Sequence, residues 1–184
     1  AVAVADFNGD THLDLALAAH LKGLTVLLGD GKGSFHLGAG PDTFEPNPAT
    51  RFTSRALVAH DWNRDGKPDL IALGEGPRPG GKASGSFGSV VYLNQGNDQW
   101  RKQVLPAADN AFGDTLAMGD VNNDGQTDIL TASLSFENKK LVQYGEVDTA
   151  PAEIAALPPR SYIYAVALAD FDNDQRDDLV IGAL

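Results

Sequence analysis

Four short segments of this chain share one arrangement of oxygen-bearing side chains that suits a hard metal ion. Each follows the pattern Asp-x-[Asn/Asp]-x-Asp-x-x-x-Asp-[Leu/Ile], and the copies start at Asp6, Asp61, Asp120 and Asp170. Ca²⁺ takes about six to eight oxygen ligands at roughly 2.3 to 2.6 Å, and a tight loop with carboxylates or carboxamides at alternate positions turns them inward. The pattern therefore predicts four calcium-binding loops.

The predicted ligands stand at loop positions 1, 3, 5, 7 and 9. Positions 1, 3, 5 and 9 would bind through their side chains, whereas position 7, whose identity varies freely, would bind through its backbone carbonyl. The side-chain ligands are Asp6, Asn8, Asp10 and Asp14; Asp61, Asn63, Asp65 and Asp69; Asp120, Asn122, Asp124 and Asp128; and Asp170, Asp172, Asp174 and Asp178. The carbonyl ligands are His12, Lys67, Gln126 and Arg176. Up to four Ca²⁺ ions are expected.

The acidity of the chain is concentrated in these loops. Thirteen of the 25 Asp and Glu residues occupy the ligand positions, so the other 12 nearly balance the 14 Lys and Arg, although the net charge is −11. Several carboxylates packed into one loop repel one another unless a cation is present, and a cation that binds only the folded state adds stability. The alternative, that Asp, Asn and Gly merely mark exposed turns, explains one such loop better than four in register.

An EF-hand shares the first half of this spacing but needs a bidentate Glu at position 12. That position holds Leu17, Ala72, Thr131 and Ile181. The segments after the loops are also short, apolar and bounded by Gly or polar residues, which favours strands over helices. EF-hands are therefore excluded, and position 9 is expected to close each loop.

The loops recur roughly every 50 to 60 residues, a period typical of repeat architectures. A strand is expected before each loop, at Val2 to Ala5, Ala56 to His60, Thr115 to Gly119 and Tyr162 to Ala169, and after it, at Leu13 to Ala19, Asp69 to Gly74, Asp128 to Ser133 and Asp178 to Gly182. Third strands are expected at Leu24 to Leu28, Ser89 to Leu93 and Lys140 to Tyr144, and fourth strands at Ser34 to Leu37, Trp100 to Leu105 and Glu153 to Leu157.

Four antiparallel strands per repeat make one blade of a β-propeller, so the predicted fold is all-β. The strands after the loops support this, because Leu15 and Leu17 alternate with Ala16 and Ala18, which makes both faces apolar, as in sheets stacked face to face. Residues 1–184 are expected to form a single propeller segment of about three and a half blades. Its repeats are approximately 1–50, 51–109, 110–159 and 160–184, the last one incomplete.

The chain resembles the FG-GAP or VCBS-type repeats of integrin α-subunit propellers and of many bacterial surface and secreted proteins. The resemblance rests on Asp-Phe-Asn-Gly-Asp at residues 6–10, on Asp-Gly-x-x-Asp at 65–69 and 124–128, and on Leu-Leu-Gly-Asp-Gly-Lys-Gly-Ser-Phe at 27–35, which is similar to the family's hairpin between third and fourth strands. It implies a calcium-stabilised propeller, usually seven-bladed, with the metal in the loop that joins the first two strands.

The first and fourth loops depart from the family pattern. They carry Thr11 and Gln175 where the other two loops have Gly66 and Gly125. Because Gly tolerates the positive φ that such a turn can require, weaker binding is expected in these two loops.

An arc of three and a half blades would leave two bare sheet edges. The rest of the propeller is therefore expected to come from the same longer chain, or else from a second copy that joins to complete a ring. Light scattering on the isolated chain would separate the two.

Two classes of function are compatible with these features. The first is an extracellular or cell-surface scaffold that binds a protein or glycan, because such loops suit the high calcium concentration outside cells. The alternative is a polysaccharide hydrolase or lyase with structural calcium, because propellers can assemble paired carboxylates from different blades. The sequence has no Gly-x-Ser-x-Gly, His-Glu-x-x-His or Walker motif, which favours the scaffold. Its acidity argues against nucleic-acid binding, and no apolar run in this segment could span a membrane.

Two groups of residues outside the loops have more than one interpretation. The connections Gly38 to Thr50 and Gly74 to Gly88 could recognise a ligand, although their Gly, Pro and Ser content favours mobile insertions. The aromatic residues at loop position 2, which are Phe7, Trp62 and Phe171, are predicted to pack between blades. Trp100, Tyr162 and Tyr164 are weaker candidates for a sugar-binding platform, with packing as the default.

Overall fold

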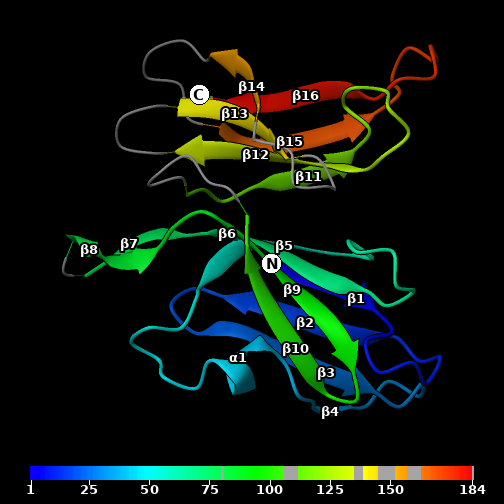
Figure 1. Ribbon diagram of the computed structural model, residues 1–184, viewed down its shortest axis with the longest axis vertical. Helices are drawn as coiled ribbons and strands as arrows, with labels where there is room; N and C mark the ends of the chain where they lie inside the picture. The colour runs from blue at the N-terminus through cyan, green and yellow to red at the C-terminus, as the bar shows by residue number, and fades with distance from the viewer. Residues whose placement is uncertain (80, 106–111, 135–138, 145–151, 157–162, 184) are drawn as a thin grey trace.

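Four antiparallel sheets stacked one against the next form the body of the computed structural model (Figure 1), which describes every residue except 80, 106–111, 135–138, 145–151, 157–162 and 184. The first sheet contains β1 (Val2–Ala5), β2 (Asp14–Ala19), β3 (Gly23–Gly29) and β4 (Phe35–Leu37). The second contains β5 (Ser54–His60), β6 (Asp69–Gly74), β9 (Ser89–Gly96) and β10 (Gln99–Val104). The third contains β11 (Leu116–Gly119), β12 (Asp128–Leu134), β13 (Lys139–Tyr144) and β14 (Ala152–Ala156). The fourth contains β15 (Ile163–Ala169) and β16 (Asp178–Ala183).

Each of the first three sheets follows chain order from one edge to the other, which is the arrangement of a propeller blade. The first strands of successive sheets pack against one another, β1 with β5, β5 with β11 and β11 with β15. The predicted all-β fold of four-stranded propeller blades, with a fourth blade present in part, is confirmed. The number of blades in a complete ring stays a prediction.

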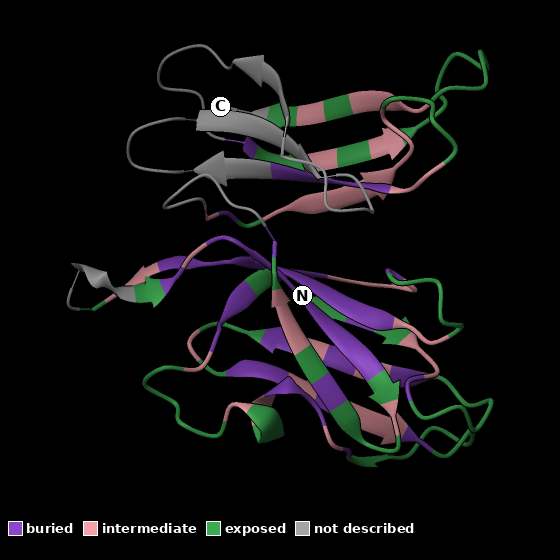
Figure 2. Ribbon diagram, viewed as in Figure 1, coloured by how far each residue is buried: buried purple, intermediate pink, exposed green. Residues whose placement is uncertain are grey.

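The central strands are buried on both faces. On β6, Leu70 and Ala72 belong to the apolar cluster between the first and second blades, whereas Ile71 belongs to the cluster between the second and third. On β12, Ile129 faces the second blade and Leu130 packs with residues of the fourth. Figure 2 shows this burial in the middle of the stack, with exposed residues in the loops. Apolar burial between blades is therefore the main force that stacks the sheets.

The aromatic residues at loop position 2 follow the prediction in two of three cases. Phe7 and Trp62 are 7% and 5% exposed and pack toward the following blade. Phe171 is 58% exposed, and because the described residues place no blade beyond the fourth, its packing between blades stays a prediction. Trp100 packs on Phe7, with ring centroids 6.1 Å apart, whereas Tyr164 is exposed. Tyr162 lies outside the described residues.

Both long connections contain regular structure. The first includes α1 (Pro41–Phe44), and the second forms a hairpin of β7 (Gly76–Arg78) and β8 (Gly81–Ser86) that projects from the stack (Figure 1). Arg78 holds this hairpin to the first connection, because its guanidinium donates hydrogen bonds to the carbonyls of Pro48 and Ala49. A role of either connection in recognition stays a prediction. Within the described part of the chain, no helix is long and apolar enough to cross a membrane.

A buried carboxylate joins the first two blades at the end of β6 opposite its acidic loop. Glu75 accepts hydrogen bonds from Thr53 Oγ1 at 2.7 Å and from the backbone N–H of Leu21 at 3.1 Å, and lies 2.9 Å from His20 Nδ1. Burial by itself would raise the pKa of Glu75, but the contacts with Thr53, His20 and Leu21 outweigh it and hold this pKa below its ordinary value. The ionised carboxylate therefore stabilises the contact between blades.

The two-sided packing of β6 can be tested by emptying one side. We expect Ile71→Ala to lower the free energy of unfolding by about 2–5 kcal/mol, because it leaves a cavity between two blades. The control Val104→Ala, at a side chain that is 64% exposed, should change it by less than about 0.5 kcal/mol. Urea unfolding, monitored by tryptophan fluorescence, measures the free energy of unfolding of both variants. Equal losses in the two variants would contradict the burial of Ile71 between the second and third blades.

The Glu75 contact should depend on pH. Glu75→Gln should lower the free energy of unfolding at neutral pH by about 1–3 kcal/mol, because the charged hydrogen-bond acceptor is lost. Since the folded pKa lies below the ordinary value of 4.5, the carboxylate contributes fully above that pH and loses its contribution as pH falls through the folded pKa. Thermal unfolding at neutral and acidic pH should therefore show the difference between wild type and variant shrinking on acidification. A difference that stayed constant would rule this explanation out.

Candidate metal centre

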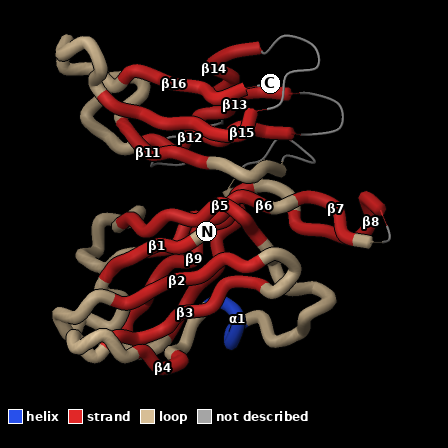
Figure 3. The backbone as a smooth tube through the Cα atoms, turned by 180° about the vertical axis from the view of Figure 1, so that it is seen from behind, coloured by secondary structure: helices blue, strands red, loops and turns tan. Residues whose placement is uncertain are grey.

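Each acidic loop joins the first and second strands of its blade, and all four lie along the same side of the stack. In Figure 1 they form the right-hand margin, from the blue loop below to the orange loop above, and Figure 3 shows them together from behind. The side chains that the sequence predicts as ligands are therefore placed at the same structural position in every blade.

The carboxylate at position 1 organises the loop backbone. In the second loop, Asp61 accepts the N–H of Asp65 on one oxygen at 2.9 Å and the N–H of Gly66 on the other at 2.8 Å. The other three loops repeat both contacts at 2.8 to 3.1 Å. Position 1 thus points into the turn formed by positions 5 and 6.

Positions 3 and 5 turn toward the same point. Asn63 Oδ1 accepts the N–H of Asp65 at 3.1 Å, while Asn63 Nδ2 donates to Asp65 Oδ2 at 3.2 Å. The first and third loops share this pair of contacts. The ammonium group of Lys67 lowers the pKa of Asp65, and the backbone N–H of His12 lowers that of Asp10. These carboxylates are therefore ionised at neutral pH, and Asp65 Oδ2 lies 3.1 Å from the ammonium nitrogen of Lys67.

The fourth loop holds the most negative charge, because Asp172 replaces the Asn at position 3. Carboxylate oxygens of Asp170, Asp172 and Asp174 all lie within 4.8 Å of one another. Two oxygens that bind one Ca²⁺ at roughly 2.3 to 2.6 Å can be at most about 5 Å apart, so this spacing fits a single ion. Three exposed carboxylates at such distances also repel one another, which a cation would relieve.

The carboxylate at position 9 closes the loop against the blade, and it is buried in the first three loops and half-buried at Asp178 in the fourth. Asp14 accepts the N–H of Phe7 at 2.8 Å and, from the third strand, the N–H of Gly29 at 2.8 Å. Asp69 makes the same two contacts with Trp62 and Asn94, at 2.9 and 2.7 Å. Burial raises the pKa of Asp69 despite these donors. Because each carboxylate oxygen has a second lone pair, these residues can still accept a cation.

The loop backbone requires positive φ at position 6. The angle is 72° at Thr11, 85° at Gly66, 79° at Gly125 and 71° at Gln175. The sequence-based expectation that Gly is replaced by strained residues in the first and fourth loops is therefore confirmed for the backbone. Its consequence for affinity stays a prediction, since the extra carboxylate of the fourth loop acts in the opposite direction.

The structure thus brings together the predicted side chains at positions 1, 3 and 5 of each loop. It places position 9 beside them as a loop-closing residue that also contacts the main chain. At position 7, the N–H of His12, Lys67, Gln126 and Arg176 donates to the position-5 carboxylate. Binding through the position-7 carbonyl stays a prediction. The donor set contains only oxygen, which suits Ca²⁺.

Two residues that the sequence did not single out connect neighbouring loops. Asn94, at the end of the third strand of the second blade, donates its side-chain N–H to the carbonyl of Phe7 in the first loop at 2.7 Å. Asp177, at position 8 of the fourth loop, accepts the N–H of Asp120 in the third loop at 2.9 Å. An alignment of the repeats on their third strands places Asn94 at the position of Gly29. This difference between equivalent positions is the one sequence signal that could have identified Asn94.

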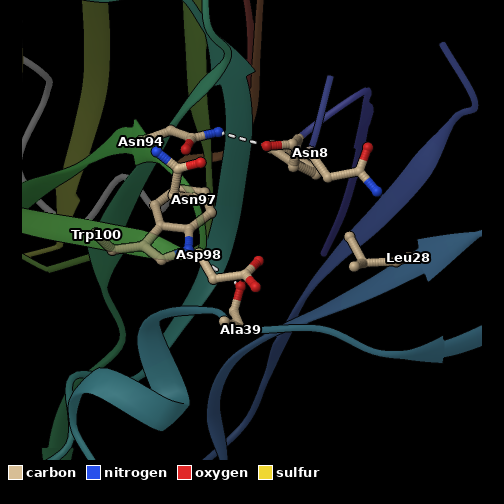
Figure 4. Close-up of a pocket in the computed structure, with 8 residues that line it drawn as sticks. Asn8, Leu28, Ala39, Asn94, Asn97, Asp98 and Trp100 are labelled. Carbon is tan, nitrogen blue, oxygen red and sulfur yellow. Dashed lines mark hydrogen bonds between the residues drawn. The ribbon is translucent and has the colours of Figure 1, made fainter. Parts of the chain in front are cut away.

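A cavity of about 290 Å³ opens beside the contact between Asn94 and the first loop (Figure 4). The first blade contributes Asn8 and Leu28 to its wall, and the second contributes Asn94, Asp98 and Trp100. The indole N–H of Trp100 donates to the carbonyl of Ala39 at 3.0 Å, which holds the ring in the wall of this cavity.

Comparison with known proteins agrees with the repeat structure. The family described as FG-GAP-like repeat matches residues 6–72 and, in a second copy, residues 61–131. Each match begins at position 1 of an acidic loop and ends within the second strand of the next blade. The chain is also 32% identical to integrin alpha-7 of Homo sapiens over 143 residues, which is 70% of this chain and 12% of that protein.

The backbone requirement at position 6 can be measured without metal. Gly66→Ala should lower the free energy of unfolding in EGTA by about 1–2 kcal/mol, because an L-residue resists this left-handed conformation. A Cβ at Gly66 would meet no heavy atom within 4 Å, so the loss would report the backbone alone. The reverse change, Thr11→Gly, should raise the free energy of unfolding by up to about 1 kcal/mol. If urea unfolding showed that Gly66→Ala leaves the free energy of unfolding unchanged, position 6 would not require the left-handed conformation.

Proposed function

Because the chain belongs to the family of FG-GAP-like repeat proteins, we propose that it is part of a calcium-stabilised, adhesion-type propeller scaffold. One observation supports calcium most strongly: four loops present the same arrangement of oxygens on one side of the stack, at the junction of the same two strands. The ligands would be the side chains at positions 1, 3, 5 and 9 and the carbonyl at position 7.

Calcium, when bound, would neutralise the carboxylates of each loop. The residues of the chain supply the rest of the geometry. In the second loop, position 1 fixes the turn, positions 3 and 5 would complete the ring of oxygens, and the buried carboxylate of Asp69 connects this ring to the second and third strands. Ordering the loop would thereby stiffen the blade at its junction with the neighbouring blade.

We further propose an extracellular or cell-surface setting and a protein or glycan ligand. Exposed loops with few rigid constraints typically bind Ca²⁺ with the sub-millimolar to millimolar affinity of extracellular modules. The similarity to an integrin α-subunit agrees with adhesion, but the matched segment spans only 12% of that protein. The activity and partners of the whole protein are therefore part of the proposal.

The calcium proposal predicts a specific pattern of thermal stability. EGTA should lower the melting temperature and Ca²⁺ should restore it, since a site held at about 100 times its Kd adds roughly 2.7 kcal/mol. Asp124→Ala should remove at least about a quarter of the total calcium-dependent increment, because it disables one of the two loops that have Gly at position 6 and are expected to bind more tightly. Differential scanning calorimetry with and without Ca²⁺ measures this increment directly.

Asp30 offers a matched control outside the loops. Its carboxylate accepts the N–H groups of Lys32 and Ser34 at 2.8 and 3.0 Å in the turn between β3 and β4, so it makes similar turn contacts. Asp30→Ala should lower the melting temperature but keep the full calcium-dependent increment. If the melting temperature of the wild type did not change with Ca²⁺, the calcium proposal would be contradicted.

The ligand class is tested separately on the full-length protein. A glycan array should detect stable binding if the propeller recognises glycans, and a polysaccharide-degradation assay should then show no bond cleavage. Cleavage without stable binding would favour the alternative, a polysaccharide hydrolase or lyase with structural calcium.

A further inference from the structure

The side chain of Asn94 lies at the contact between the first and second acidic loops. It is 2% exposed, and both polar atoms of its side chain have hydrogen-bond partners. The amide Nδ2 donates to the carbonyl of Phe7 at 2.7 Å, and Oδ1 accepts the N–H of Gly96 at 3.0 Å. The backbone N–H of Asn94 donates to Asp69 Oδ1 at 2.7 Å.

This contact reaches the backbone of the first loop directly and a candidate ligand of the second loop through the N–H of Asn94. Phe7 stands between Asp6 and Asn8, and its N–H donates to Asp14 Oδ2 at 2.8 Å. The second oxygen of Asp69 accepts the N–H of Trp62 at 2.9 Å. A continuous series of hydrogen bonds therefore runs from Asp14 through Phe7 and Asn94 to Asp69.

The corresponding residue of the first blade shows what the side chain adds. Gly29 also closes its loop with a backbone N–H, which donates to Asp14 Oδ1 at 2.8 Å. It has no side chain with which to reach another blade. Closing a loop therefore needs only the backbone at this position, and the amide group of Asn94 has the separate effect of joining two loops.

We propose that Asn94 couples calcium binding in the first loop to calcium binding in the second, so that occupancy of either raises the affinity of the other. This inference rests on the proposed calcium function. An ion in the first loop orders Phe7, and through Asn94 it also holds Asp69 in the position that an ion in the second loop needs. The second ion then loses less conformational entropy on binding, which gives positive cooperativity, and the effect is reciprocal.

Terbium luminescence can measure the affinity of the second loop. Trp62 stands at position 2 of that loop and can sensitise a Tb³⁺ ion bound there. Trp100 lies against Phe7 of the first loop, so Trp100→Phe is included in every protein to leave the second loop as the reporter. Four proteins are compared in this background: the parent, Asp10→Ala, Asn94→Ala and the double variant.

Coupling predicts that Asp10→Ala, which disables the first loop, weakens Tb³⁺ binding at the second loop by about fivefold or more when Asn94 is present. In the Asn94→Ala background, Asp10→Ala should leave that affinity unchanged. Asn94→Gly, which reproduces the residue of the first blade, should behave in the same way and serves if the Ala variant folds poorly. Thermal unfolding in EGTA confirms that each variant is folded.

The outcomes separate this inference from the function beneath it. Equal weakening by Asp10→Ala in both backgrounds, or weakening in neither, would overturn the coupling while leaving calcium binding intact. Suppose that Asp65→Ala removed none of the Tb³⁺ luminescence and that the melting temperature did not change with Ca²⁺. These two results together would overturn the calcium function and the coupling with it. Asp98→Asn, which removes a charge beside Asn94 without removing the amide, should preserve the effect of Asp10→Ala.

Discussion

The carboxylate at the ninth position of the acidic loops, which is buried in the first three of them, is the constraint on which the loop geometry depends. Asp14 and Asp69 are fully buried, and each accepts one N–H from the loop and one from the third strand. A charged group in such a place is unfavourable unless it is well compensated, and burial raises the pKa of Asp69 accordingly. Two backbone donors supply part of that compensation. A neighbouring cation would supply more, which joins the metal proposal to the stability of the blade.

Polar contacts at the two ends of the stack complement the apolar contacts at its centre. In the middle, β6 buries alternate residues against the blades on either side. At one end Glu75 binds the turn of the first blade, and at the other Asn94 binds its acidic loop. Asp177 makes an analogous contact between the fourth and third loops. The order of each loop is therefore connected to the position of its neighbouring blade, which explains how loop ligands could stiffen the whole scaffold.

The sequence predicted the features that depend on local spacing. Oxygen-bearing side chains at alternate positions of a tight loop converge because their placement depends only on the backbone of that loop. A strand that is apolar on both faces, such as β6, must lie between two other layers of the structure. Contacts between blades were not predictable in the same way. Asn94 and Glu75 are single polar residues whose partners lie far away in the chain. Phe7 is buried and Phe171 exposed because a following blade covers only Phe7 within the described residues, and no pattern at either residue itself distinguishes the two.

A crystal structure determined from crystals grown in saturating Ca²⁺ would show whether the acidic loops bind calcium. We expect an ion in each loop, bound at roughly 2.3 to 2.6 Å by side-chain oxygens from positions 1, 3, 5 and 9 and by the carbonyl of position 7. Anomalous scattering would identify the ion. Loops that contained only water at saturating Ca²⁺, with their carboxylates bound solely to backbone N–H groups, would show that calcium does not organise the blades.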